Sequence, residues 1–167
     1  QPKAEPKASK LAVGDAAPLE RVLTAHGVTV HRTAPVPADH EEERTYLKHV
    51  QRGNYSIGGA DFFRVIGNNV ILLNSFHLPF RRSFIWSVRR VLEPLMEHSD
   101  AVYVATPPPS PHYTRDDLYL ENGDIMVDGH NVYVGMSGNA SSPKGIGWLG
   151  RLLGSDYRVH TIRLKPD

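Results

Sequence analysis

The sequence has no cysteine among its 167 residues. The chain therefore forms no disulfide, offers no thiolate to a metal and supplies no thiol nucleophile of its own. Long apolar runs are also missing, so no segment is expected to span a bilayer. No secretory pattern opens the chain either. We therefore expect a cytoplasmic protein that does not contact membranes.

Charge of one sign is not concentrated anywhere in the chain. The formal net charge is +1, and charged residues make up 22 % of the sequence. This balance argues against a protein that binds nucleic acid or a membrane surface through bulk electrostatics. The nine histidines are scattered and form no HxH or HExxH motif, so we expect no metal site. Glycine-rich nucleotide-binding motifs are also absent, and we expect no cofactor.

A repeated order of segments is the main feature that is present. One stretch runs DFFRVIGNNVILLN from Asp61, and a second runs DIMVDGHNVYVG from Asp124. Each is followed by a helix-like segment and a strand-like segment, which predicts two ββαβ modules over residues 57–106 and 120–167. Residues 15–34 are typical of a half module, a helix followed by a strand at 28–33. The same order can also arise by chance in an α+β domain.

Local signals mark the turns, helix ends and loops of these modules. Gly67-Asn68-Asn69 and Asp128-Gly129-His130-Asn131 tolerate positive φ and predict hairpin turns. Gly154 predicts a helix end, and Pro94 a kink or an end. The Pro-rich segments 33–46 and 106–119 are expected to be loops, and residues 1–14 a disordered or processed segment. Repeats of this size usually close into rings or stacks, so we expect the chain to be part of a larger assembly.

Acidic residues stand at similar places in the two modules. Asp61 and Asp124, 63 residues apart, each precede the first strand and follow small residues (GGAD-FF and ENGD-IM). A carboxylate after small residues can approach a ligand closely. The alternative is an ordinary turn acid that bonds to its own backbone. Glu121 also has two interpretations, a site acid or a solvated loop acid.

The pairing of GGADFFRVIGNNVI with LENGDIMVDGHNVYVGMSG, followed by DYRVHTIRLKPD, resembles the guanidino-group-modifying enzymes called penteins. Among them, the stretch GGADFFRVIGNNVILLNSFHLPFRRSF is most similar to the arginine-type amidinotransferases. The resemblance covers about residues 15–167 and implies an α/β (α+β) fold of ββαβ modules in a five-module ring with the active site on its axis. This chain would form about half of such a ring.

The resemblance also implies roles for the three acids. Asp61 would hold the substrate guanidinium, Glu121 would orient the catalytic histidine, and Asp124 would support the substrate site. The catalytic histidine and the nucleophilic cysteine would lie outside this chain, in the remainder of the enzyme or in a complementary chain. A homodimer is left open.

Three functions are consistent with this resemblance. The first is an amidinotransferase-like enzyme that moves an amidino group from arginine or another guanidino donor to an amine through a cysteine adduct. The second is a deiminase or dimethylarginine-hydrolase-like enzyme, which the Glu-Asn-Gly-Asp motif favours. The third is a guanidino-binding module without catalytic activity, which the lack of cysteine favours.

Overall fold

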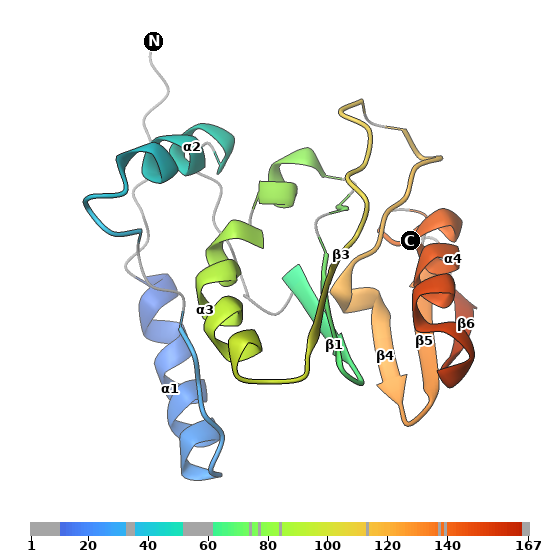
Figure 1. Cartoon of the computed structure of the whole chain (residues 1–167), viewed down its shortest axis with the longest axis horizontal. Helices are drawn as coiled ribbons and strands as arrows, with labels where there is room; N and C mark the ends of the chain where they lie inside the picture. The colour runs from blue at the N-terminus through green and yellow to red at the C-terminus, as the bar shows by residue number, and fades with distance from the viewer. Residues whose placement is uncertain are drawn as a thin grey trace. The chain divides into compact units, whose positions relative to one another are not determined.

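The structure is a computed structural model of the chain (Figure 1). It describes residues 11–32, 36–51, 62–73, 75–76, 78–83, 85–112, 114–136, 138 and 140–164. The chain divides into two compact units, residues 1–32 and residues 33–167.

The first unit is a helix followed by a segment with no helix or strand. Helix α1 (Leu11–Ala25) contains Pro18, and Gly27 follows it with a φ of +78°. The predicted helix and its glycine end are thus present, but residues 28–32 form no strand. A strand requires a neighbouring strand for its backbone hydrogen bonds, and none pairs with residues 28–32 in the part of the chain that the structure describes. The helix also includes residues 11–14 of the segment expected to be disordered, while residues 1–10 lie outside the described part.

The second unit contains two three-stranded sheets of identical topology. In each sheet an antiparallel hairpin is followed by a helix and then by a strand parallel to the hairpin's second strand. The first set comprises β1 (Phe63–Ile66), β2 (Asn69–Leu72), α3 (Ile85–Glu97) and β3 (Val102–Ala105). The second comprises β4 (Ile125–Asp128), β5 (Asn131–Met136), α4 (Pro143–Leu153) and β6 (Arg158–Arg163). Both predicted ββαβ orders are therefore present.

Two-residue turns close both hairpins. Gly67 and Gly129 have φ values of +57° and +56°, which side-chain-bearing residues rarely adopt. Each glycine is the first residue of its turn, so the turn chemistry fixes the register of the strands on either side.

The spacing of Val88, Leu92 and Leu95 predicts one buried stripe on α3, and the structure follows it with one difference. Ile85, Val88 and Leu92 form the buried stripe of α3, whereas Leu95 is 45 % exposed. The helix continues three residues past Pro94, which removes a hydrogen bond only in the last turn. Helix α4 ends before Gly154, as predicted, and that glycine has a φ of +60°.

Helix α2 (Glu41–Gln51) occupies part of a segment that was expected to be a loop, so the prediction for residues 33–46 was wrong at its end. Glu41, Glu42 and Glu43 lie in the first turn, where carboxylates interact favourably with the helix dipole. Residues 106–112 and 114–121 form no helix or strand, which agrees with the second predicted loop.

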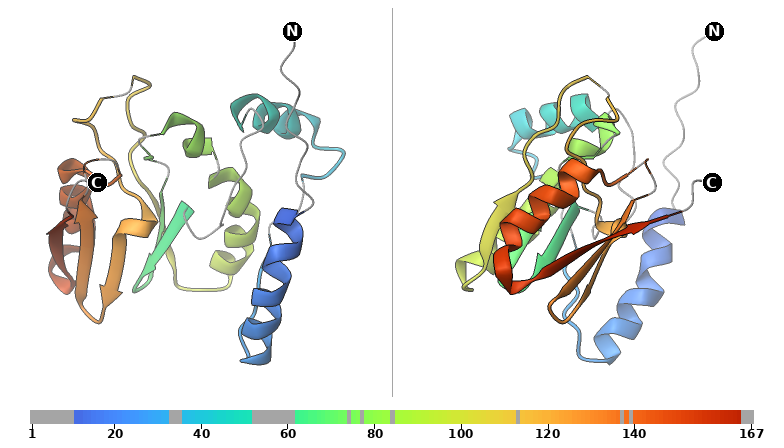
Figure 2. Two further views of the ribbon diagram at one scale, coloured as in Figure 1. Left: turned by 180° about the vertical axis from the view of Figure 1, so that it is seen from behind. Right: turned by 90° about the vertical axis from the view of Figure 1, so that its right-hand side faces the viewer.

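The first sheet lies between α3 and the second ββαβ set (Figures 1 and 2). One face packs on α3 in a cluster of Phe62, Val70, Leu72, Phe76, Ile85, Val88 and Leu92. The opposite face joins the second set in a cluster of Ile66, Ile71, Leu73, Leu120, Ile125, Val132, Val134, Ile146, Leu149 and Leu153. None of the helices in the described residues is both long enough and apolar enough to cross a membrane.

Candidate functional site

Glu121 lies where the long loop returns to the second sheet. Leu120, fully buried, precedes it and donates its N–H to the Ser75 carbonyl oxygen at 3.3 Å. The short helix η3 (Asn122–Asp124) follows and leads directly into β4. The Glu121 side chain is 14 % exposed, so its carboxylate lies mostly within the protein.

A closed ring of three hydrogen bonds fixes the backbone at Glu121. The Glu121 N–H donates to Ser141 Oγ at 3.1 Å, and the Ser141 N–H donates to Asp124 Oδ2 at 2.8 Å. The Asp124 N–H then donates to the Glu121 carbonyl oxygen at 3.2 Å. Ser141 is buried, so water does not compete readily for these bonds. Asp124 therefore serves the structure through one carboxylate oxygen.

Arg81 binds the Glu121 carboxylate. It comes from the short helix η2 (Pro79–Ser83), and its Nη1 lies 2.9 Å from Glu121 Oε2. The guanidinium carbon lies 4.4 Å from the centre of the Phe76 ring, so the cation also contacts an aromatic face. The site thus already holds a carboxylate with a planar cation beside it.

Asp61 lies outside the described residues, so its predicted position is not part of the structure. Its neighbour Phe62 is buried and meets Phe76 edge to face, with ring centres 5.8 Å apart. Phe76 in turn contacts Arg81, the partner of Glu121. The residue next to Asp61 is therefore linked to Glu121 through three successive contacts.

The two acids that the sequence pairs do not occupy equivalent positions relative to the hairpins. The turn glycines Gly67 and Gly129 are 62 residues apart, whereas Asp61 and Asp124 are 63 apart. By strand register, Asp124 corresponds to Phe62. The position of Asp61 in the first module therefore corresponds to Gly123 in the second. The repeat therefore does not support equal roles for these acids.

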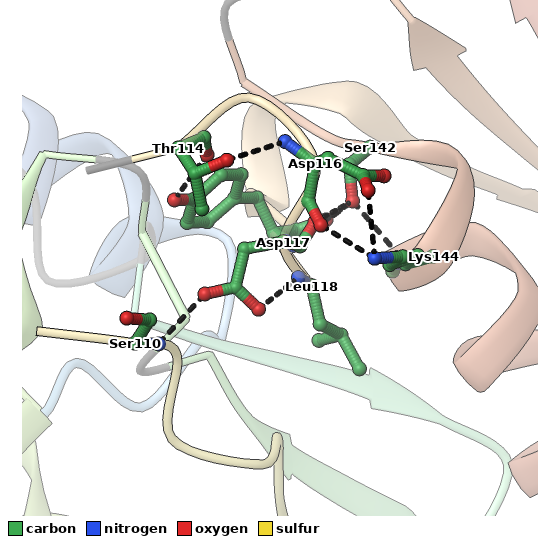
Figure 3. A network of polar contacts seen from close by, with 9 residues as sticks. Ser110, Thr114, Asp116, Asp117, Leu118, Ser142 and Lys144 are labelled. Atoms are coloured by element: carbon green, nitrogen blue, oxygen red, sulfur yellow. Dashed lines mark hydrogen bonds and ion pairs between the residues drawn. The ribbon is translucent and has the colours of Figure 1, made fainter. Parts of the chain in front are cut away.

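Arg82 and Asp117 hold the neighbouring loops together. Arg82 donates to the carbonyl oxygens of Phe76, at 2.7 Å, and Ser110, at 2.9 Å. Asp117 accepts the N–H groups of Ser110 and Leu118, each at 2.7 Å (Figure 3). These two hydrogen bonds, first that from Leu118, hold the pKa of the Asp117 carboxyl below its ordinary value.

Ser142 joins the same loop to the start of α4 (Figure 3). Its Oγ donates to the Asp117 carbonyl oxygen at 2.7 Å and accepts the Tyr119 N–H at 3.0 Å. It also caps α4 by accepting the Gly145 N–H at 3.1 Å. Lys144 adds an exposed ion pair with Asp116 at 3.2 Å.

Sequence reasoning missed the pair Ser141-Ser142, whose hydroxyl oxygens accept the N–H groups of Glu121 and Tyr119. The signal was present in the run Ser-Ser-Pro, because serine is a preferred N-cap and proline a preferred first helical residue. The pairing of Arg81 with Glu121 spans 40 residues, and no local signal announces it.

A cavity of about 680 Å³ lies between α2 and α3. Arg90 binds Glu43 across it, and this hydrogen bond lowers the pKa of Glu43. Tyr46 and Trp86 meet edge to face with ring centres 6.2 Å apart. The charged groups here pair with one another, which favours a role in attaching α2 to α3. In the part of the chain that the structure describes, no three histidine or acidic side chains gather to hold a metal ion.

No protein-family model matches the chain, and no curated protein matches it in sequence. Solved structures do match it in fold. An amidinotransferase of the saxitoxin biosynthetic pathway from Microseira wollei has a TM-score of 0.75 at 21 % identity. It is matched over 96 % of this chain and 50 % of its own length.

Two further solved structures also match the chain in fold. The inosamine-phosphate amidinotransferase of Streptomyces griseus has a TM-score of 0.66 at 17 % identity, over 92 % of this chain and 47 % of its own. The N-terminal domain of a cyanobacterial arginine dihydrolase has a TM-score of 0.57 at 17 % identity, over 93 % and 47 %. The chain thus spans about half the length of these proteins, and it has the pentein fold.

Proposed function

We propose that the chain forms part of an amidinotransferase-like enzyme, which moves an amidino group from arginine or another guanidino donor to an amine. The observation that carries this proposal is the Glu121 carboxylate, fixed in place on a fold that solved amidinotransferases share. We propose a cytoplasmic location for this reaction, in keeping with the lack of cysteine in the sequence.

The pairing of Glu121 with Arg81 favours the role proposed for this acid. A carboxylate that already binds one guanidinium has less negative charge to offer a second. Glu121 therefore suits the orientation of a catalytic histidine, while Asp61 is the acid proposed to hold the substrate guanidinium through paired hydrogen bonds. Asp124 supports the site through Ser141, and its second oxygen is the one proposed to face substrate.

The proposed chemistry needs groups from outside this chain. A cysteine thiolate attacks the guanidinium carbon, and the bond from that carbon to the departing amine breaks as a histidine protonates the amine. The acceptor amine then attacks the amidino carbon, and the thiolate leaves. In a hydrolase, water takes the place of the acceptor amine.

The test uses the complete native protein with arginine, in the presence and absence of a panel of primary amines. Ornithine that forms only with an acceptor supports the proposal. Citrulline, or ornithine formed without an acceptor, supports the hydrolase that Glu-Asn-Gly-Asp and the dihydrolase likeness favour. A native product without a cysteine from any chain rules out thiol catalysis.

Variants of the same protein test the roles of the acids. Glu121→Gln should lower kcat by about 100-fold or more, since an oriented general acid contributes at least this much. Asp61→Asn should instead weaken arginine binding. Asp116→Asn is the matched control, because its carboxylate is 88 % exposed and should leave both constants unchanged. Equal effects of all three substitutions would contradict the assignment.

A further inference from the structure

The cavity between α2 and α3 takes its first wall from the start of α2. Glu42 and Glu43 line it one turn before Tyr46 and Leu47. Residues four positions apart lie on the same side of a helix, so the two carboxylates and the aromatic ring border one space. Leu47 is buried, whereas Tyr46 is 49 % exposed. The volume of about 680 Å³ is within the range of cavities that bind small organic molecules.

The opposite wall is one face of α3, which contributes an aromatic ring and three charged groups: Trp86, Arg89, Arg90 and Glu93. The Arg89 guanidinium carbon lies 5.5 Å from the centre of the Trp86 ring, so this ring already interacts with a cation. Trp86 is 39 % exposed and meets the Tyr46 ring edge to face. The two exposed rings therefore give the cavity aromatic surface, which attracts cations through the negative charge over each ring face.

The charged groups of the cavity leave one carboxylate without a cation. Arg90 donates to Glu43, and Arg89 donates to Glu93. These two ion pairs use both guanidinium groups of the lining. Glu42 has no hydrogen bond or ion pair among the residues that the structure describes. Three carboxylates against two guanidinium groups leave one negative charge, which favours a cationic ligand.

We propose that this cavity binds a small organic ammonium ion with an apolar body, such as an arylalkylamine. The charged nitrogen would donate to the Glu42 carboxylate, and the body would lie against the Tyr46 and Trp86 rings. A metal ion would gain nothing from these apolar walls, and Glu42 would repel an anion. The ion pair of Arg90 with Glu43 holds the two helices in place around the site. The proposal does not depend on the proposed function.

Photo-labelling of the complete native protein tests the site. The probe is para-azidobenzylammonium, its neutral control is para-azidobenzyl alcohol, and mass spectrometry of tryptic peptides locates the label. The ammonium probe should label the peptides of residues 45–48 and 83–89, which contain Tyr46 and Trp86, and excess benzylammonium should prevent this labelling. Equal labelling of these peptides by the alcohol, or labelling of other peptides only, would overturn the proposal.

Substitutions measure the contribution of each group, with the probe concentration that gives half-maximal labelling of the two peptides as the readout. Glu42→Gln should raise this concentration about fivefold, because it removes an exposed ion pair. Tyr46→Ala should raise it about tenfold through the loss of the ring, whereas Tyr46→Phe, which keeps the ring, should leave it within about twofold.

Glu97→Gln is the matched control for the loss of charge. Glu97 is exposed at the end of α3 and does not line the cavity, so its substitution changes the total charge by the same amount as Glu42→Gln. The control should leave the half-maximal concentration unchanged. Equal effects of Glu42→Gln and Glu97→Gln would refute the site, since the probe would then respond to overall charge alone.

Discussion

Gly145 packs directly against the backbone of Tyr119, two residues before Glu121. It lies in the first turn of α4, where a Cβ would stand 1.9 Å from the Tyr119 carbonyl oxygen and 2.7 Å from its carbon. These are backbone atoms, so no side chain can rotate away. Because real Cβ contacts essentially never fall below 3.0 Å, Gly145→Ala must move the start of α4 by about 1 Å.

That movement would stretch the bonds between Ser142 and Tyr119, which are 3.0 Å long in both directions. Losing two buried hydrogen bonds costs about 2 kcal/mol, and overpacking costs about 1–3 kcal/mol. The higher helix propensity of alanine returns about 1 kcal/mol. We therefore expect Gly145→Ala to lower the free energy of unfolding by about 2–4 kcal/mol.

Gly147→Ala is the matched control in the same helix. Gly147 is exposed, and its nearest neighbour would be Arg151 Nη1 at an ordinary 3.5 Å. The free energy of unfolding of this variant should rise by about 1 kcal/mol from helix propensity alone. Urea unfolding of the chain, followed by circular dichroism, measures both values. If Gly145→Ala is as stable as Gly147→Ala, α4 does not pack directly on the Tyr119 backbone. The hydrogen bonds between Ser142 and Tyr119 then do not hold the segment that leads to Glu121.

Two further predictions concern contacts elsewhere in the second unit. Gly67→Ala and Gly129→Ala should each lower the free energy of unfolding by about 1 kcal/mol, because both positions have a positive φ. Gly67→Ala should lose more, because its Cβ would meet the Tyr157 hydroxyl at 2.5 Å, and Tyr157→Phe should remove that excess in urea unfolding. Asp117 has a folded pKa below its unfolded value, so its contribution to stability is full above about pH 5 and falls away as the pH drops through the folded pKa. Asp117→Asn should therefore flatten the acid limb of unfolding free energy against pH, and an unchanged limb would contradict this.

Local chemistry allowed most of the second unit to be predicted. The turn glycines Gly67 and Gly129 specify two-residue hairpins, and the spacing of Val88 and Leu92 specifies a buried helix face. The end of α4 before Gly154 follows in the same way. Each of these signals depends only on residues that are close together in the sequence, so it can be recognised without knowledge of the fold.

Features that depend on distant partners could not be predicted. Residues 28–32 have the composition of a strand but form none, because no neighbouring strand meets them among the described residues. Helix α2 depends on the acidic first turn and on contacts such as that of Glu43 with Arg90, 47 residues away. At the candidate site, the ring of bonds through Ser141 likewise joins segments that are separate in the sequence.

The one-residue difference between the acid spacing and the strand spacing changes the meaning of the repeat. With an offset of 62, Glu121 corresponds to Gly59 and Asp61 to Gly123, so each acid stands where the other module has glycine. The repeated sheets supply a common frame, while the acids arise from differences between the modules. Acids at non-equivalent positions have different surroundings, as the Arg81 partner of Glu121 shows. Such differences are what the proposed function requires, because it assigns substrate binding to one carboxylate and the orientation of a catalytic group to the other.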